Sequence, residues 1–561
     1  MAFVRIEPGP DDDAVPVTQN EARARALERD NNILPWRIDM LSDGALEALD
    51  GLLDHMCHYP GRYSKEALAG AFLLQAALVT GRTVSRLLAL PIMRMEPSEL
   101  EAESAAGLYI GRRSWAWWLE AGRPSSRQDL PDKAKPFYRG SQERMLLGCG
   151  ERTRRLLQIA IRKRGFRLLR VDPAPGSRKS QIIIPPTVGL GWTQSAHRQL
   201  TSACLDRLPP AQRHALSARR IERWLFQRLI DETGEAAIGA IVTGNVTTQA
   251  NAMVHYTWLS AVDALSHQHA HAARYDLISR NGLKPPCPPM AELPSALRSS
   301  TRGHGSRYVL TETSVQRLAF KLQRLASSMH WPRGLDDLIN GHNAFTLYSL
   351  ALIGFGTGLR PGVDPIPHPR RIDLLTGLLV WNDKDRQLGE GDRLLWLPEA
   401  ARDQIVRYYR HLEALRADLE RREFPGTEAL RPVDDERQSL FLLSAGSELR
   451  RSGPKEIAKA FDDLGLPIRL NVWRHYLRTA LVGKLPGDVL MAFLGHWQRG
   501  QNPWDTYSAL DPSIYIGELS QHLPKLLQRD GWSPLWGLGA PPPPPRPEQE
   551  LEARTRASLV W

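Results

Sequence analysis

A segment rich in Pro, Gly and Ser, residues 282–307, is the feature that most constrains the fold of this chain. It reads GLKPPCPPMAELPSALRSSTRGHGSR, and such a composition interrupts helices and strands and is typical of an interdomain linker. The chain has 561 residues, which is too long for one ordinary hydrophobic core. The sequence therefore predicts separately packed parts on either side of this segment.

Composition and periodicity divide the rest of the chain. We expect a loosely ordered N-terminus (1–35), a helical and basic region (36–210), a second helical region (211–281), a C-terminal domain (308–535) and a Pro-rich tail (536–561). Between 36 and 125, apolar residues recur at spacings of three and four, as in SKEALAGAFLLQAALVTGRTVSRLLAL, and predict helix. GRRSWAWWLEAGR (111–123) sets three tryptophans among arginines. They would either stack on nucleic-acid bases or, as we favour, lie buried in a helix.

The charge balance favours a polyanionic partner. Lys and Arg number 73 against 62 acidic residues, giving a formal net charge of +11. The densest basic stretch is ERTRRLLQIAIRKRGFRLLR (151–170), whose apolar residues predict an amphipathic helix or helix–strand unit. It could lie along a phosphate backbone or be a solvated charged face. Its candidate DNA contacts are Arg154, Arg155, Arg162, Lys163, Arg164 and Arg167.

Several classes of protein are disfavoured. The four cysteines are far apart and form no CxxC pair, which argues against a disulfide framework and a cysteine-based zinc site. The N-terminal residues have no signal-peptide core, and the longest apolar runs fall short of a membrane span. We therefore expect a soluble cytoplasmic protein without a membrane partner. The sequence contains no Walker motif and no credible acidic metal cluster, which agrees with the absence of a cofactor that the family resemblance given below implies.

After residue 307 the pattern becomes more specific. HNAFTLYSLALIGFGTGLR reads as an apolar helix ending in a Gly-rich turn, which places Arg360 just past the helix end. Apolar residues then alternate through LLVW and LLWL, with GEGD between them, and predict two or three short antiparallel strands followed by a helix. Lys384 would lie in the turn of that hairpin. Taken singly, Arg360 is also compatible with an ordinary helix end, and Lys384 with a solvated turn.

The stretch NVWRHYLRT (471–479) places three potential cations among apolar residues. On a helix, His475 and Arg478 share one face, because they are three residues apart, whereas Arg474 points to another side and is better interpreted as a structural or DNA-backbone contact. Guanidiniums together with an imidazole suit a phosphate better than a metal. His496 follows in LGHW, and Tyr507 and Tyr515 come next.

In order, these elements resemble the tyrosine recombinase (phage integrase) family over about residues 310–530. The matching residues are Arg360, Lys384, His475, Arg478 and His496. The resemblance implies a mainly α, multidomain protein with a helical DNA-binding N-terminal region. The catalytic domain would be α-rich, with a small antiparallel β-sheet. It further implies cleavage and rejoining of double-stranded DNA through a 3′-phosphotyrosine, a tetramer on DNA, accessory proteins and nucleoid association, in integration or excision of a mobile element.

Two departures from the family pattern leave alternatives open. Arg478 and His496 are 18 residues apart, which is shorter than the family spacing and implies trimmed helices. Tyr507 fits the family spacing for the nucleophile better, whereas Tyr515 follows Asp511 and Pro512 and would lie in the first turn of a helix. A non-catalytic DNA-binding or architectural relative is the alternative function. Type IB topoisomerase chemistry uses similar residues, but TGLR and LGH favour the recombinase.

Overall fold

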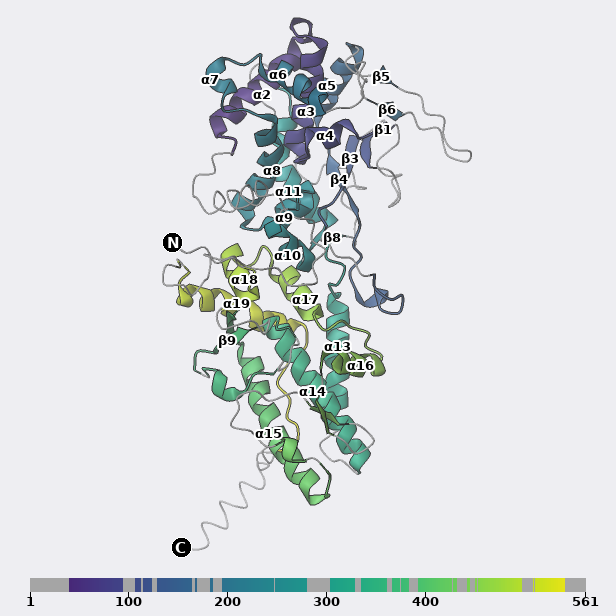
Figure 1. Cartoon of the computed structure of the whole chain (residues 1–561), viewed down its shortest axis with the longest axis vertical. Coiled ribbons are helices and arrows are strands. Elements are labelled where there is room, and N and C mark those ends of the chain that lie inside the picture. Colours follow the sequence, from purple (N-terminus) through teal and green to yellow (C-terminus); the bar gives the residue numbers. More distant parts are fainter. Residues whose placement is uncertain are drawn as a thin grey trace, which may run out of the picture.

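The computed structural model divides into two lobes, one above the other along the long axis (Figure 1). We call residues 40–279 the N-terminal lobe and residues 303–539 the C-terminal lobe. Each lobe has its own large cluster of buried apolar side chains. The structure describes residues 40–93, 106–111, 115–123, 129–163, 167–168, 182–184, 194–246, 248–279, 303–327, 334–360, 366–373, 375–382, 392–425, 427–430, 441–443, 449–451, 453–496, 508 and 510–539.

The chain is mainly helical, as the sequence predicted. In the N-terminal lobe, α3 lies at the centre, because nearly all of its side chains are buried and it packs against α5, α6 and α8. Its first turn is capped by the Ser64 side chain, which accepts a hydrogen bond from the Ala67 N–H. The helices of this lobe are α2 (Asp43–His58), α3 (Lys65–Thr80), α4 (Val84–Leu88), α5 (Glu151–Arg162), α6 (Gln194–Leu205), α7 (Pro210–Arg213), α8 (Ala218–Thr233), α9 (Ala236–Thr243), α10 (Thr248–Tyr256) and α11 (Ala261–Ala272).

A six-stranded sheet in the N-terminal lobe corrects the prediction of helix throughout 36–125. Its strands run in the order β4-β3-β2-β1-β6-β5, and the tryptophan-rich segment forms β3. Trp117 and Trp118 are buried, as we favoured, but in this strand instead of a helix. A strand covered on both faces gives a continuous apolar run, which periodicity alone cannot distinguish from a buried helix. The strands are β1 (Ile92–Met93), β2 (Gly107–Ile110), β3 (Trp115–Glu120), β4 (Arg144–Gly148), β5 (Arg167–Leu168) and β6 (Ile182–Ile184).

The C-terminal lobe is built on α14, which is buried along most of its length. The predicted hairpin is present: β9 and β10 pair antiparallel, with Leu395 opposite Leu379, and a long helix follows. The elements of this lobe are α13 (Glu312–Ser327), α14 (Leu335–Thr357), β9 (Leu378–Asn382), β10 (Asp392–Trp396), α15 (Glu399–Arg421), β11 (Phe441–Leu443), β12 (Leu449–Arg451), α16 (Pro454–Asp463), α17 (Val472–Leu481), α18 (Gly487–Leu494) and α19 (Pro512–Arg529).

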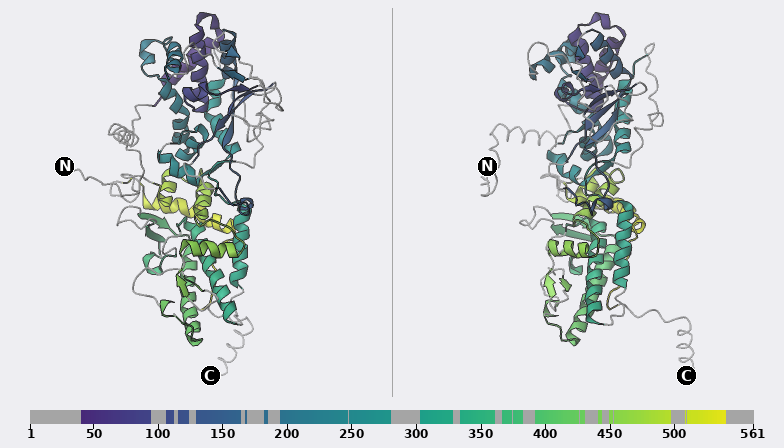
Figure 2. Two further views of the ribbon diagram at one scale, coloured as in Figure 1. Left: turned by 45° about the vertical axis from the view of Figure 1, so that its right-hand side comes forward. Right: turned by 90° about the vertical axis from the view of Figure 1, so that its right-hand side faces the viewer.

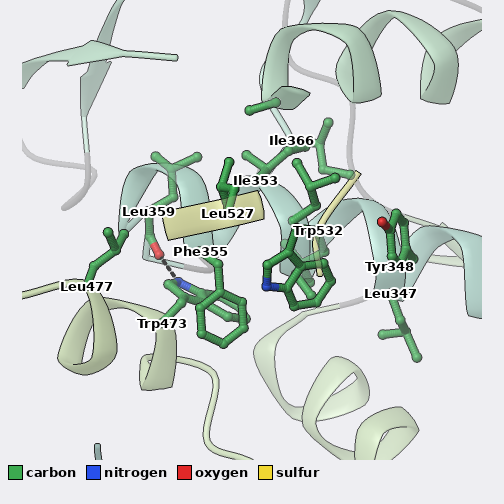
Figure 3. Packing of buried hydrophobic residues seen from close by; sticks show 14 of the residues in the cluster. Leu347, Tyr348, Ile353, Phe355, Leu359, Ile366, Trp473, Leu477, Leu527 and Trp532 are labelled. Atoms are coloured by element: carbon green, nitrogen blue, oxygen red, sulfur yellow. Dashed lines mark hydrogen bonds between the residues drawn. The ribbon is translucent and has the colours of Figure 1, made fainter. Parts of the chain in front are cut away.

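Aromatic packing fixes α17 against the end of α14. Phe355 of α14 lies edge-on to Trp473 of α17 and stacks on Trp532, with ring centroids 6.3 and 5.3 Å apart (Figure 3). The indole N–H of Trp473 donates to the carbonyl oxygen of Leu359, in the turn after α14. This donor anchors the turn that carries Arg360 to the helix that carries His475 and Arg478.

The two lobes meet at α17 and α18, and the views of Figure 2 keep these yellow-green helices between the lobes. From the N-terminal lobe, α10 and β7 (Trp258–Ser260) contact α17, and β7 pairs with β8 (Gly303–Gly305), the first strand of the C-terminal lobe. The backbones approach closely here, because a Cβ atom on Gly487 would lie 2.0 Å from the Gly234 oxygen. Residues 303–306, which were included in the predicted linker, are buried in this junction; residues 282–302 lie outside the described part of the chain.

No helix in the described part of the chain is long and apolar enough to cross a membrane.

Candidate functional site

The end of α14 presents Arg360 at the junction of the lobes. The helix ends where Gly358 adopts a left-handed conformation with φ 63°, a conformation that favours glycine. The chain leaves the helix axis there, so Arg360 lies past the helix end, as the sequence predicted. Its side chain is half-buried, and its Nη2 lies 3.4 Å from the Tyr256 hydroxyl, to which it donates.

α17 presents His475 and Arg478 to the N-terminal lobe, and both side chains are buried. His475 Nδ1 lies 2.8 Å from the hydroxyl oxygen of Ser306. Arg478 donates from Nε to Thr257 Oγ1 at 2.9 Å and from Nη2 to Glu235 Oε2 at 2.6 Å. The spacing of three residues thus places both groups on one face, as predicted, and that face is covered by Glu235, Thr257 and Ser306.

His496 follows directly after α18. This helix ends at Gly495, which is left-handed with φ 62° and turns the chain toward α17. His496 Nε2 lies 3.3 Å from Arg474 Nη2. Because a guanidinium only donates, the imidazole accepts at Nε2 and carries its proton on Nδ1.

Two further buried arginines hold the ends of α14 and α18 together. Arg474 donates to the carbonyl oxygens of Gly358 and Leu494, and Arg393 of β10 donates to those of Thr357, Gly358 and Phe493. The last carbonyls of a helix lack partners within the helix and carry partial negative charge, so guanidiniums stabilise them. The predicted structural role of Arg474 is therefore seen directly, and it lies beside the site.

Guanidinium groups dominate the electrostatics around the two imidazoles. Burial lowers the pKa of His496 well below its usual value, and the guanidiniums of Arg474, Arg478, Arg360 and Arg393 lower it further. Burial likewise lowers the pKa of His475, followed by repulsion from His255 and Arg474. Both imidazoles are consequently neutral near pH 7. A bound phosphate or other anion would offset the arginine charges.

Tyr256 of α10 occupies the space between these groups. Its ring centroid lies 4.6 Å from that of His475 and 5.2 Å from that of His496, on which it stacks. The guanidinium carbon of Arg474 lies 5.1 Å from the same ring, within range of a cation–π contact. Three residues of the C-terminal lobe thus surround one phenol ring of the N-terminal lobe, which is 7 % exposed.

Three buried polar atoms of the site have no hydrogen-bond partner among the described residues. They are Arg478 Nη1, Glu235 Oε1 and His496 Nδ1. Buried polar groups are normally satisfied, and each exception calls for an unseen water or ligand. The two donors among them, Arg478 Nη1 and His496 Nδ1, suit an anionic oxygen.

Of the two candidate nucleophiles, Tyr515 lies among the described residues. Tyr507 and Lys384 lie outside the described residues. Tyr515 lies in the first turn of α19, after the Asp511 cap and Pro512, as predicted. However, it is 2 % exposed, and its hydroxyl donates to the Leu394 oxygen of β10 at 2.6 Å. Burial raises the pKa of Tyr515 far above that of free tyrosine, which disfavours the phenolate.

The predicted DNA contacts of 151–170 lie in the N-terminal lobe at a distance from α17 (Figure 1). α5 exposes Arg155, Arg162 and Lys163. Arg154 is half-buried against Trp115, with its guanidinium carbon 5.8 Å from the ring centroid. Nothing is described of the side chains of Arg164 and Arg167. Arg152, by contrast, is buried and pairs with Asp50 and Asp54 at 2.7 and 3.3 Å.

The sequence analysis missed Arg393, Tyr256, Thr257, Glu235 and Ser306. Arg393 did leave a signal: in DRLLWLP it is in phase with Leu395 and Leu397, which places its guanidinium on the buried face of the strand. The other four left none, because they come from the first half of the chain or its connection. Their role depends on how the lobes meet.

Comparison of the chain with protein-family models, with curated proteins and with solved structures gave no match. The functional interpretation therefore depends on the residues and their arrangement.

Proposed function

We propose that this chain is a DNA strand-transfer enzyme that cleaves and rejoins DNA through a tyrosine, as a site-specific recombinase does. The observation that carries the proposal is that Arg360, His475, Arg478 and His496 lie together around Tyr256 and Thr257 at the junction of the lobes. These residues come from three separate segments of the C-terminal lobe, in the order the family resemblance requires. A cluster of arginines around neutral imidazoles suits a phosphodiester, because each guanidinium can donate paired hydrogen bonds to its oxygens.

The chemistry follows from the charges. Attack of a phenol oxygen on phosphorus forms the O–P bond to tyrosine and builds negative charge on the non-bridging oxygens, which Arg360 and Arg478 would stabilise. The phenol proton passes to a base, a role that a neutral imidazole such as His475 or His496 can serve. The bond from phosphorus to the 5′ oxygen breaks, and Lys384 would protonate that oxygen. The 5′ hydroxyl of another strand then reverses the step, so no external energy source is required.

Tyr507 is the nucleophile we propose. It follows His496 by eleven residues in the sequence, a spacing that fits the family resemblance better than that of Tyr515. Tyr515, in contrast, is buried with its hydroxyl proton donated to a strand carbonyl. A tyrosine held in that way needs α19 to move before it can attack.

Nicked duplexes of candidate target sequences test the proposal, because release of a short end traps the covalent intermediate. We expect a protein–DNA adduct that resists denaturation. Tyr507→Phe should abolish it, since the nucleophilic oxygen is removed. Tyr515→Phe should retain it and lower stability by about 1 kcal/mol through loss of one hydrogen bond. Absence of an adduct in the unsubstituted protein across all duplexes, or its loss in Tyr515→Phe alone, would contradict the assignment.

A second candidate function is DNA binding without catalysis. The Arg478–Glu235 ion pair favours it, since the carboxylate engages a guanidinium that the reaction would need. On this view the protein binds DNA and bends or bridges it. The adduct experiment separates the two functions, because an architectural protein shifts the duplex in a gel without forming a covalent bond.

A further inference from the structure

We propose that the N-terminal lobe is a latch that closes the anion site, and that DNA must displace it. This inference rests on the proposed function, because it concerns regulation of the same site. The latch consists of Glu235, Tyr256 and Thr257, all from the N-terminal lobe. Each of them contacts a group that the C-terminal lobe would offer to the phosphodiester.

The first step of the argument is chemical mimicry. The Glu235 carboxylate is 1 % exposed and lies 2.6 Å from Arg478 Nη2. A carboxylate accepts from a guanidinium in the way a phosphate oxygen does. Burial raises the pKa of Glu235, although Arg478 opposes that shift. The carboxylate therefore occupies one of the donor positions of Arg478 that a phosphate oxygen would need, and its negative charge would repel the phosphodiester.

The second step is steric. The Tyr256 ring fills the space among His475, His496 and Arg474, and its hydroxyl accepts from Arg360. A phosphodiester carries a sugar on each side and cannot share this space with a phenol ring. Residues on three segments of the C-terminal lobe must lose their contacts with Tyr256 before they can bind DNA.

The third step is mechanical, because the latch lies on the junction itself. Tyr256 and Thr257 connect α10 to β7, where the Trp258 N–H donates to Thr479 Oγ1 of α17 at 3.0 Å. Thr479 Oγ1 in turn donates to the backbone carbonyl oxygen of Tyr256 at 3.4 Å. Gly234, beside Glu235, approaches Gly487 at the start of α18. Separation of the lobes here would withdraw the carboxylate and the ring at the same time.

Two substitutions open the latch in different ways. Tyr256→Ala removes the ring from the site. Gly487→Ala leaves the site untouched but places a Cβ atom 2.0 Å from the Gly234 oxygen, which wedges the lobes apart. Gly517→Ala is the matched control, because a Cβ atom on this α19 glycine would meet nothing within 4 Å. Thermal unfolding shows whether each variant is folded, and two independent opening variants keep the test decisive if one is not.

Two readouts separate the latch from the proposed function. Hydrogen exchange of the Trp258 amide, without DNA, reports lobe opening. We expect it to become at least tenfold faster in Tyr256→Ala and Gly487→Ala and unchanged in Gly517→Ala. Binding of a fluorescent 30-base-pair duplex at fixed salt should tighten about tenfold in the same two variants.

Each outcome decides something. Faster exchange with unchanged or weaker DNA binding would overturn the latch, because opening would then not expose the site. Unchanged exchange in both variants would overturn it as well. A third outcome is that exchange becomes faster but neither the variants nor the unsubstituted protein binds any duplex. That outcome would contradict the proposed function and not the arrangement of the junction. Loss of the covalent adduct in Tyr256→Phe would also overturn the latch, because Tyr256 would then be the nucleophile.

Discussion

Arg393 shows at the scale of one residue how a buried charge can organise a site. It is 1 % exposed and donates to carbonyls at the ends of both α14 and α18. A buried charge is costly unless it is compensated by hydrogen bonds and opposite charge. The compensation here comes from the carbonyls at two helix ends. The guanidinium thereby fixes the ends of α14 and α18, which directly precede the segments that carry Arg360 and His496.

We therefore expect Arg393→Met to lower the free energy of unfolding by about 3 kcal/mol, because carbonyls of two helix ends lose their donor. Urea denaturation measures this loss. Arg416→Ala is the control, since Arg416 forms a solvated pair with Glu420 on α15 and its loss should cost no more than about 0.5 kcal/mol. Equal effects of the two substitutions would contradict the structural role of Arg393.

The residues that could be predicted from the sequence are those whose position follows from a local rule. Arg360 follows a glycine C-cap, and the spacing of His475 and Arg478 fixes their common face. Tyr256 and Glu235 obey no such rule: Glu235 is 243 positions from Arg478 in the sequence. A contact of that kind depends on how the two lobes pack against each other, and local sequence patterns do not predict that packing.

At the scale of elements, α14 and α15 are joined by a buried histidine pair. His342 Nδ1 lies 2.9 Å from His411 Nε2, and the rings stack with centroids 5.2 Å apart. His411 Nδ1 accepts from the Leu538 N–H, so this imidazole is held neutral. Burial lowers the pKa of His411 well below its usual value, and repulsion from His342 adds to the shift.

This pair makes stability depend on pH. In the unfolded chain His411 binds a proton as the pH falls through about 6.5, whereas the folded chain cannot. The unfolded state then binds more protons, so the free energy of unfolding falls below that pH, by up to about 1.4 kcal/mol per pH unit for each such histidine. His304, whose pKa burial lowers to about 4, His475 and His496 act in the same direction.

Urea denaturation between pH 5 and 8 checks this prediction. We expect little change above pH 7.5 and a steep fall below pH 6. His411→Gln should reduce the slope, because it removes a histidine whose pKa burial lowers in the folded chain. Stability that rises toward pH 5 would contradict the assignment of neutral buried imidazoles.

Elements were predictable where periodicity is unambiguous. The β9–β10 hairpin alternates cleanly, and α19 begins at a Pro after an Asp cap. The prediction of helix around Trp117 was wrong, because a strand covered on both faces and a buried helix both appear in the sequence as an apolar run. In the six-stranded sheet, β1 also pairs with β6, which follows it by about ninety residues in the sequence. No local sequence pattern predicts this pairing.

At the scale of the molecule, basic side chains are exposed on α5 and directly after it, away from the candidate site (Figure 1). DNA binding that depends on phosphate contacts weakens as salt is added. The logarithm of the binding constant falls with the logarithm of the salt concentration, with a slope of about 0.9 for each contact. We expect Arg155→Gln, Arg162→Gln and Lys163→Gln together to reduce that slope by about 2 to 3 in binding titrations. The matched control replaces three arginines that pair with carboxylates, Arg213, Arg228 and Arg416. An unchanged slope in the α5 variant would remove this helix from the DNA-binding surface.

The position of the covalent bond tests the central claim most directly. After reaction with a nicked duplex and digestion with nuclease and trypsin, the residues around both candidate tyrosines lie in one peptide, 500–525. We predict that fragmentation mass spectrometry finds a nucleotide joined through its 3′ phosphate to the oxygen of Tyr507. A nucleotide on Tyr256, attachment to any residue outside this peptide, or no attachment at all would contradict the account.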